Sequence, residues 1–412
     1  MKVILSHPTG NANVRAAADG LLQAGLLAEF QTSIASFPGG LLHGLGGIGP
    51  LAEIRRRGFD PKLIPFTRQW PWRESGRLLA SRLHLSGLTR HESGIFCVDE
   101  VYRSIDKRTG HRMKALNRKG LEGVYAYEDG AYHTFSQAKK LGIRCLYDLP
   151  IGYWRSLRAV LNTEKERWPT WISTMTGIKN SEAKLSRKDD ELKLADAIFV
   201  ASSFTATTLR DFPGQLAPVS VIPYGFPSVY EQREYDGRRG GPLKLLFVGG
   251  LSQRKGIAYL FAAVESFGRD VELTIVGRKA SEDCKPLNDA LSRHKWIPSV
   301  SNAAVLELMR QHDVLVFPSL FEGFGLVITE AMSQGTPVIT TERTAGPDLI
   351  TNGEDGWVIE GGSTSALKAA IERLVNNRDL VISAGIKATE TARKSPWSVY
   401  SKALAEAVAA IL

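Results

Sequence analysis

Residues 313–339, DVLVFPSLFEGFGLVITEAMSQGTPVI, carry the most informative local pattern in the chain. The apolar run at 313–319 predicts a buried strand, and the stretch 326–334 predicts a short helix that ends at Gly335 and Pro337. A second apolar run follows directly. A buried strand, a short helix and another buried strand in this order are typical of a parallel sheet with helices on its faces.

The same alternation of apolar runs and helical patterns occurs along the whole chain. The runs read KVILS, GVYAYE, IRCLYD and AIFVAS in the first half and LKLLFVGG, ELTIVG, VLVFPS and PVITT in the second. Between the two sets, residues 221–242 are rich in proline, glycine and charge, which predicts an interdomain linker. We therefore predict an α/β protein with two doubly wound, Rossmann-like domains, 1–222 and 223–394, and a terminal helix in 395–412.

The composition agrees with two domains. The chain has 412 residues and is 43% hydrophobic, and one core seldom grows beyond about 250–300 residues. We find neither a secretory signal pattern nor a run of roughly 18 apolar residues, so we expect a cytoplasmic protein. The three cysteines, Cys97, Cys145 and Cys284, are widely spaced and suit a reduced compartment better than a disulfide framework or a zinc site.

The net charge of +9 comes from one region. Residues 53–119 hold 16 Lys and Arg against 7 Asp and Glu, whereas the rest of the chain is balanced. A basic face attracts nucleic acid, anionic lipid or phosphorylated substrates, or is only a solvated arginine-rich surface. Without a nucleic-acid-binding motif, an anionic membrane or a phosphate-bearing acceptor is the favoured functional interpretation, with Arg55, Arg56 and Arg57 as the first residues to test.

The loop at 320–325 is the predicted binding position. It lies at the carboxyl end of a predicted parallel strand and leads into a helix, which is where doubly wound sheets bind ligands. We expect backbone N–H groups at Gly325, Leu326 and Val327 to hold an anion, because the first helical turn leaves its donors unpaired. Gly323 and Gly325 allow a ligand to approach the chain closely.

Two glutamates stand in this segment. Glu330 lies one turn into the helix, on the side of the expected anion site, where its carboxylate would accept hydrogen bonds from ribose hydroxyls. Glu322 lies in the loop, where it would hold sugar hydroxyls or stabilise developing positive charge. The alternative is that Glu330 only interacts with the helix dipole and that Glu322 is a solvated loop residue.

With these residues the chain resembles the large retaining glycosyltransferase family four, whose C-terminal domain carries two glutamates separated by seven residues. Glu322 and Glu330 match that spacing within PSLFEGFGLVITEAMSQGTPVI. Further segments that resemble the family follow in its order: ADAIFVASSFTATTL, VIPYGF, LFVGGLSQRKGIAYLFAAV and GPDLITNGEDGWVI. The resemblance is good over about residues 195–400 and loose over the first 190.

The resemblance implies the fold called GT-B. In that fold the second domain holds a nucleotide-sugar donor, the first domain holds the acceptor, and the C-terminal helix packs back on the first domain. The resemblance makes Glu322 and Lys255 catalytic: Glu322 contacts the transferred sugar, and Lys255 neutralises the leaving diphosphate. It also implies a ribose contact for Glu330. The donor-binding set is then Glu330, Arg254, Gly250, Phe324, Gly325, Leu326 and Val327.

Two positions depart from the family pattern. Gly250 stands where the family often has a phosphate-binding arginine, and Arg254, next to Lys255, is the candidate substitute. Tyr147 stands near the place of a histidine that faces the donor sugar in many members. Trp296 borders the expected base site, where it either stacks on the base or belongs to the core.

In the first domain, SHPTGNANVRAAADGLLQAGL predicts a turn and an amphipathic helix with Asn11 or Asn13 as its N-cap. The resemblance implies that Gly10 forms a turn facing the donor phosphates. His7, Asn11 and Asn13 are candidates to touch donor or acceptor, although a loop histidine such as His7 near a strand end is more often only polar surface. Asp148 follows a predicted strand, so we expect it to point into the cleft and orient an acceptor hydroxyl.

These observations predict a retaining glycosyltransferase that moves a sugar from a nucleotide-sugar to a hydroxyl of a polysaccharide, glycolipid or metabolite. The sequence has no D-x-D triplet, so we expect neither a metal nor a cofactor. The alternatives are a sugar-nucleotide epimerase or a phosphorylase of the same fold, or a nucleotide-sugar-binding protein with a degenerate site. The expected location is cytoplasmic, with peripheral contact to the inner membrane face as an option, and no nucleic-acid partner is expected.

Overall fold

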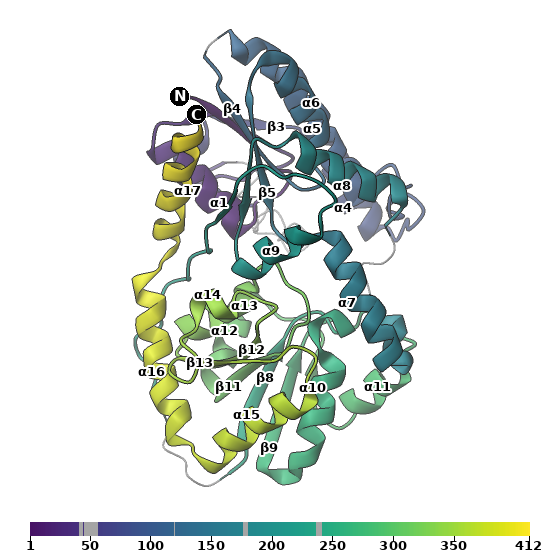
Figure 1. Ribbon diagram of the computed structural model, residues 1–412, viewed down its shortest axis with the longest axis vertical. Coiled ribbons are helices and arrows are strands. Elements are labelled where there is room, and N and C mark those ends of the chain that lie inside the picture. The colour runs from purple at the N-terminus through teal and green to yellow at the C-terminus, as the bar shows by residue number, and fades with distance from the viewer. Residues whose placement is uncertain (41–43, 45–56, 119, 176–179, 236–240) are drawn as a thin grey trace.

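The computed structural model describes residues 1–40, 44, 57–118, 120–175, 180–235 and 241–412. Each half of the chain forms one parallel sheet with helices on both of its faces (Figure 1). The predicted α/β architecture of two doubly wound, Rossmann-like units is therefore confirmed.

The first sheet has the strand order β3-β2-β1-β4-β5-β6-β7. Its strands are β1 (Val3–Ser6), β2 (Leu27–Thr32), β3 (Thr67–Gln69), β4 (Gly123–Tyr127), β5 (Arg144–Leu149), β6 (Ala197–Val200) and β7 (Val219–Val221). The central pair aligns Val3 with Gly123 and Ser6 with Ala126. The helices of this half are α1 (Ala12–Gln23), α4 (Trp72–Arg82), α5 (Val98–Asn117), α6 (Tyr132–Leu141), α7 (Trp154–Arg167), α8 (Glu182–Leu194) and α9 (Ser203–Thr208).

The second sheet has the order β10-β9-β8-β11-β12-β13. Its strands are β8 (Leu243–Val248), β9 (Val271–Val276), β10 (Lys295–Ile297), β11 (Val314–Phe317), β12 (Val338–Thr341) and β13 (Gly356–Ile359). Its helices are α10 (Ile257–Val264), α11 (Lys285–Leu291), α12 (Asn302–Gln311), α13 (Leu326–Ser333), α14 (Gly346–Leu349), α15 (Thr364–Asn376) and α16 (Asp379–Lys394). Short 3-10 turns include η5 (Gln253–Lys255), which follows β8.

Separate cores form on the faces of the sheets. On the first sheet, α1 packs on one face, and α5, α6 and α8 pack on the other. The last helix, α17 (Trp397–Ile411), leaves the second half of the chain and lies against α1, so both chain ends are in the first half (Figure 1). The chain also reaches the second half at an earlier point. Trp171, just after α7, is buried in the core of the second sheet.

Candidate active site

The candidate site lies where the second sheet reverses its strand order, between β8 and β11. Loops that leave two such strands diverge and open a crevice at the carboxyl ends of the strands. Here the loops also touch, since the Leu320 N–H donates to the Arg254 carbonyl over 2.8 Å. Gly256 has a φ of +71°, and a Cβ on it would lie 2.0 Å from the Pro318 carbonyl oxygen, so only glycine fits between the loops.

Glu322 is the centre of a charged cluster at this junction. Its Oε1 accepts hydrogen bonds from Arg254 Nη1 at 2.7 Å and from Ser319 Oγ at 2.9 Å, and it pairs with Lys255 Nζ. The side chain is only about a tenth exposed. Burial opposes ionisation of Glu322, but Lys255 and Arg254 outweigh it and hold the pKa of the carboxyl below its usual value. One carboxylate therefore binds two cations that originate in the neighbouring loop.

Glu330 lies on the helix that follows. The predicted helix is confirmed as α13, with Gly325 at its N-cap in a left-handed conformation, φ +94°. Glu330 Oε1 accepts a hydrogen bond of 3.0 Å from Asn302 Nδ2 at the start of α12, which fixes the carboxylate beside the loop. Burial raises the pKa of Glu330, and the bond from Asn302 opposes that shift.

The Glu322 loop rests on the first half of the molecule. The Gly323 carbonyl accepts hydrogen bonds from Ser202 Oγ at 2.6 Å and from Thr205 Oγ1 at 2.9 Å. A Cβ on Gly323 would lie 1.8 Å from the Pro150 carbonyl oxygen, just beyond the end of β5. Ser202 and Thr205 were not among the residues predicted for the site. Ser202 ends the apolar run AIFVAS and Thr205 follows three residues later, and this position at the carboxyl end of a predicted strand was the signal that could have found them.

Three further donor-binding candidates point their side chains into the protein. The ring of Phe324 is buried and lies 4.9 Å from that of Tyr224. Leu326 packs against the same core as Tyr224, and Val327 packs against the core of the second sheet. The ring of Phe324 is therefore enclosed, whereas Leu326 and Val327 stay partly exposed.

The first-domain candidates are spread over different environments. Gly10 is packed so closely that a Cβ would lie 2.7 Å from the ring of Phe59. Asn11 is exposed and occupies the N-cap of α1 without a side-chain capping bond. Asn13 is buried and donates to Tyr224 Oη over 3.1 Å, so its amide is bound within the protein.

His7 is buried beside the start of α1. Its Nδ1 lies 2.7 Å from the Thr9 carbonyl oxygen and 3.0 Å from the Thr9 nitrogen, and its ring makes an edge-to-face contact with Tyr127. Burial lowers the pKa of His7 to about 4, although a hydrogen bond from Nδ1 to the Thr9 carbonyl would favour the protonated ring and opposes that shift. His7 is thus a neutral core side chain at pH 7, not the polar surface residue that the sequence left open.

Asp148 does not line an open cleft as expected. Its side chain is buried, and Oδ2 accepts a hydrogen bond of 2.6 Å from Tyr125 Oη. Burial raises the pKa of Asp148 to about 7, opposed by the Tyr125 bond. Tyr147 is also buried, on the opposite face of the strand, and donates to Glu191 over 3.1 Å. Both side chains are enclosed, because helices cover both faces of β5.

Gly250 follows β8, and Trp296 lies on the edge strand β10. No described atom lies within 4 Å of the place where a Cβ on Gly250 would stand, so this exposed position has room for a side chain. Trp296 is half-buried, donates to the Gly277 carbonyl over 2.9 Å, and has Lys279 Nζ 4.8 Å from the centre of its ring. One ring face is therefore already occupied by a cation.

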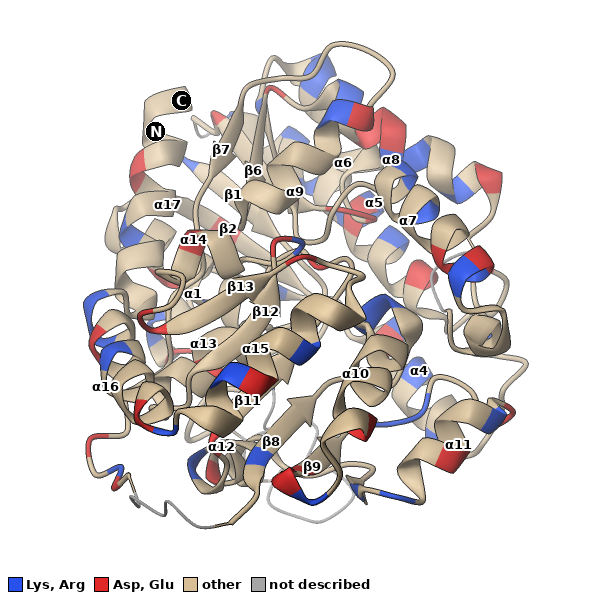
Figure 2. Cartoon of the chain, turned by 60° about the horizontal axis from the view of Figure 1, so that its bottom comes forward, with Lys and Arg blue, Asp and Glu red and all other residues tan. Residues whose placement is uncertain are grey.

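Lys and Arg are spread among Asp and Glu over the described chain (Figure 2), and the basic region 53–119 is only partly described. Arg55 and Arg56 lie outside the described residues, whereas Arg57 is buried and pairs with Glu74. Arg57 is thus part of the interior and does not present a free charge to a membrane. Among the described helices, none has the length and apolar character needed to cross a bilayer.

The second half of the chain, which holds the Glu322 cluster, is similar to known glycosyltransferases. Residues 229–391 match the model of the glycosyl transferases group 1. A phosphatidyl-myo-inositol mannosyltransferase from Mycobacterium leprae is 34% identical over 165 residues, which are 38% of this chain and 43% of that protein. Glycogen synthase from Mycobacterium tuberculosis is 27% identical over 282 residues, 66% of this chain and 64% of that protein. The chain thus spans less than two thirds of the length of each.

Solved structures extend the likeness to the whole fold. Sucrose-phosphate synthase from Thermosynechococcus elongatus aligns with a TM-score of 0.64 at 18% identity, covering 100% of this chain and 99% of that one. Anabaena Alr3699/HepE in complex with UDP aligns with a TM-score of 0.63 at 15% identity, covering both chains completely. The chain therefore has the GT-B fold of these structures, and its residues 229–391 resemble the glycosyl transferases group 1.

Proposed function

We propose that the protein is a retaining glycosyltransferase that takes a sugar from a nucleotide-sugar and transfers it to a hydroxyl group, without a metal ion. The observation that carries this proposal is the Glu322 cluster, in which Arg254 and Lys255 converge on one carboxylate at the switch point of the second sheet. Two preorganised cations at such a crevice are suited to a diphosphate whose negative charge grows as the sugar leaves.

The other residues of the site can also be given roles in this reaction. Backbone N–H groups at the start of α13 would bind a phosphate, since a helix N-terminus favours an anion. Glu330, held by Asn302, would accept hydrogen bonds from the ribose. When the diphosphate binds Arg254 and Lys255, Glu322 would exchange these cations for hydroxyls of the transferred sugar.

The relatives support a nucleotide-sugar as donor. Structures of Anabaena Alr3699/HepE are described in complex with UDP, with UDP and glucose, and with UDP-glucose. The relatives also include a phosphatidyl-myo-inositol mannosyltransferase and a glycogen synthase, so their acceptors differ. We therefore propose a hydroxyl acceptor that belongs to a polysaccharide, a glycolipid or a metabolite. The first domain would determine which of these classes binds.

A thermal-shift titration with UDP, GDP, dTDP, ADP and CMP tests the donor site, because a ligand that binds only the native state raises its Tm. We expect one nucleotide to stabilise the wild type and to stabilise Glu330→Ala less. Glu354→Ala, at an exposed surface position, is the matched control. If no nucleotide stabilises the wild type, the proposal fails. Retained transfer in EDTA checks metal independence, and strict dependence on Mn²⁺ or Mg²⁺ contradicts it.

We also propose that the enzyme works at an anionic membrane surface through α4. Trp72 and Leu79 lie on one face of this helix, Leu83 directly after it continues the spacing, and the three are 68%, 59% and 57% exposed. An apolar face flanked by arginines is typical of a helix that lies in a bilayer interface. Co-sedimentation with phosphatidylglycerol vesicles should fall in Leu79→Ser/Leu83→Ser. Equal sedimentation of this variant and the wild type would contradict the proposal.

A further inference from the structure

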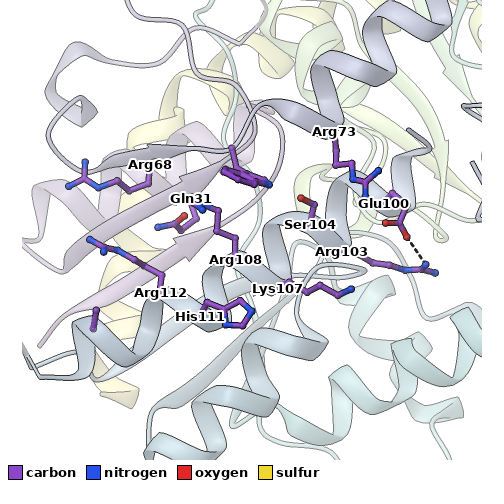
Figure 3. Close-up of a pocket in the computed structure, with 12 residues that line it drawn as sticks. Gln31, Arg68, Arg73, Glu100, Arg103, Ser104, Lys107, Arg108, His111 and Arg112 are labelled. Atoms are coloured by element: carbon purple, nitrogen blue, oxygen red, sulfur yellow. Dashed lines mark hydrogen bonds and ion pairs between the residues drawn. The ribbon is translucent and has the colours of Figure 1, made fainter. Parts of the chain in front are cut away.

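A second cavity lies in the first domain, apart from the Glu322 cluster. Its volume is about 630 Å³, which is within the usual range of small-molecule sites. Its lining side chains come from the end of β2, from β3 and the residue after it, from α4 and from α5 (Figure 3). Six basic side chains line it: Arg68, Arg73, Arg103, Lys107, Arg108 and Arg112.

Part of this positive charge is neutralised. Arg112 forms hydrogen bonds to both oxygens of Glu29, at 2.6 Å and 3.0 Å, and Arg68 lies 3.7 Å from the same carboxylate. Arg103 pairs with Glu100 at 2.9 Å. These pairs hold the walls in place and leave the charge of the remaining cations unbalanced.

The remaining cations have no acidic partner in the described part of the chain. Arg73 donates to the Ile95 carbonyl over 2.8 Å. Arg108 lies over the indole of Trp70, with its guanidinium carbon 4.2 Å from the ring centre, which orients the group without neutralising it. Lys107 lies one residue away on α5 and is exposed. Three positive groups thus face one cavity, a combination that attracts a multiply charged anion.

The position of the cavity links it to the proposed reaction. Trp70 directly follows β3, and the strands of this sheet are parallel, so Trp70 lies at their carboxyl ends. That edge of the sheet is also where Pro150, after β5, meets Gly323 of the Glu322 loop. The Trp70 end of the cavity therefore lies at the same edge of the first sheet as Pro150.

We propose that this cavity binds the phosphate of a phosphorylated saccharide acceptor. The inference rests on the proposed function for its acceptor role, but binding itself does not depend on transfer. Guanidinium groups match the geometry of a phosphate, and the polar side chains of Gln31 and Ser104 on the cavity wall suit sugar hydroxyls. The ligand is either a soluble sugar phosphate or the headgroup of a phosphorylated lipid, and both present the same chemistry.

Isothermal titration with glucose 6-phosphate, glucose and inorganic phosphate tests the inference. We expect glucose 6-phosphate to bind more tightly than inorganic phosphate, and glucose not to bind. Lys107→Glu/Arg108→Glu should weaken the binding of glucose 6-phosphate by about tenfold or more. Lys114→Glu, also exposed on α5 but outside the cavity, should leave it unchanged.

Vesicles separate the two sources of the phosphate. One outcome is that the wild type binds phosphatidylinositol vesicles but not glucose 6-phosphate. If the double variant then loses vesicle binding while Lys114→Glu keeps it, the ligand is a lipid headgroup. If neither probe binds, or if the double variant and Lys114→Glu behave alike, the inference is overturned. Nucleotide stabilisation of the double variant should equal that of the wild type. If no nucleotide stabilises either the wild type or the double variant, the result counts against the proposed function and not against this cavity.

Discussion

Glu322 holds Arg254 and Lys255 before any donor is present, so it competes with a diphosphate for the same two cations. Glu322→Gln removes this competition. We expect the variant to bind the stabilising nucleoside diphosphate about two- to tenfold more tightly, while sugar transfer falls by about a hundredfold or more. Calorimetry and initial rates measure the two effects, with Glu354→Gln as the control. Weaker nucleotide binding by Glu322→Gln would show that the carboxylate positions Arg254 and Lys255 for the diphosphate instead of competing with it.

Asp148 makes stability depend on pH. Burial raises the pKa of this carboxyl from 3.8 to about 7, so between these values the unfolded chain is ionised while the folded chain keeps its proton. The free energy of unfolding therefore falls as pH rises from about 4 to 7, by about 1.4 kcal/mol for each unit and at most about 4 kcal/mol. Above pH 7 this contribution stays constant.

Asp148→Asn keeps an oxygen that can accept from Tyr125 and cannot ionise. The variant should lose this pH dependence, so its stability relative to the wild type should rise from pH 4 to pH 7. Urea unfolding at several pH values measures the difference, and Asp283→Asn at an exposed position serves as the control. A constant difference between Asp148→Asn and the wild type across this range would contradict the assignment.

The sequence predicted the main charges of the site but not the surroundings of single side chains. Glu322, Lys255 and Arg254 meet as expected, because the loops after β8 and β11 are adjacent in any sheet of this strand order. Asp148 and Phe324 lie inside the protein instead. Their burial depends on the packing of distant segments around Tyr224, which local patterns cannot reveal.

Helix α17 is attached to the first domain through a close crossing with α1. A Cβ on Gly20 of α1 would lie 2.2 Å from the Ser401 carbonyl oxygen. In an isolated helix, Gly→Ala stabilises by about 1 kcal/mol, but here the added methyl should force the helices apart and destabilise by about 1–3 kcal/mol. Thermal or urea unfolding of Gly20→Ala shows whether the free energy of unfolding falls or rises. A stabilised variant would contradict this tight crossing.

The long apolar runs predicted the central strands well, and five shorter or more polar strands were missed. These are β2, β3, β7, β10 and β13, which lie toward the edges of the two sheets. Strand β2 carries Glu29 and Gln31 among its buried residues, since Arg112 of α5 pairs with that glutamate. Such a strand has no apolar signature, because its polar groups are satisfied by partners far along the chain.

Across the whole molecule, the two domains meet closely at Gly323. Its carbonyl accepts from Ser202 and Thr205, and its Cα faces the Pro150 carbonyl with no room for a methyl group. The backbone of Gly323 has no positive φ, so alanine brings a steric effect alone. Gly323→Ala should therefore open the angle between the domains and separate Glu322 from the acceptor side.

We expect Gly323→Ala to increase the radius of gyration in small-angle X-ray scattering and to lower transfer by about tenfold or more, since a misplacement of about 1 Å is costly in catalysis. Nucleotide stabilisation should persist, because the donor residues lie in the second domain. Gly87→Ala, where no described atom lies within 4 Å of the added carbon, is the control. Full transfer activity with unchanged scattering would mean that the enzyme reacts in a conformation in which Gly323 and Pro150 do not meet, so the contact would belong to a resting state.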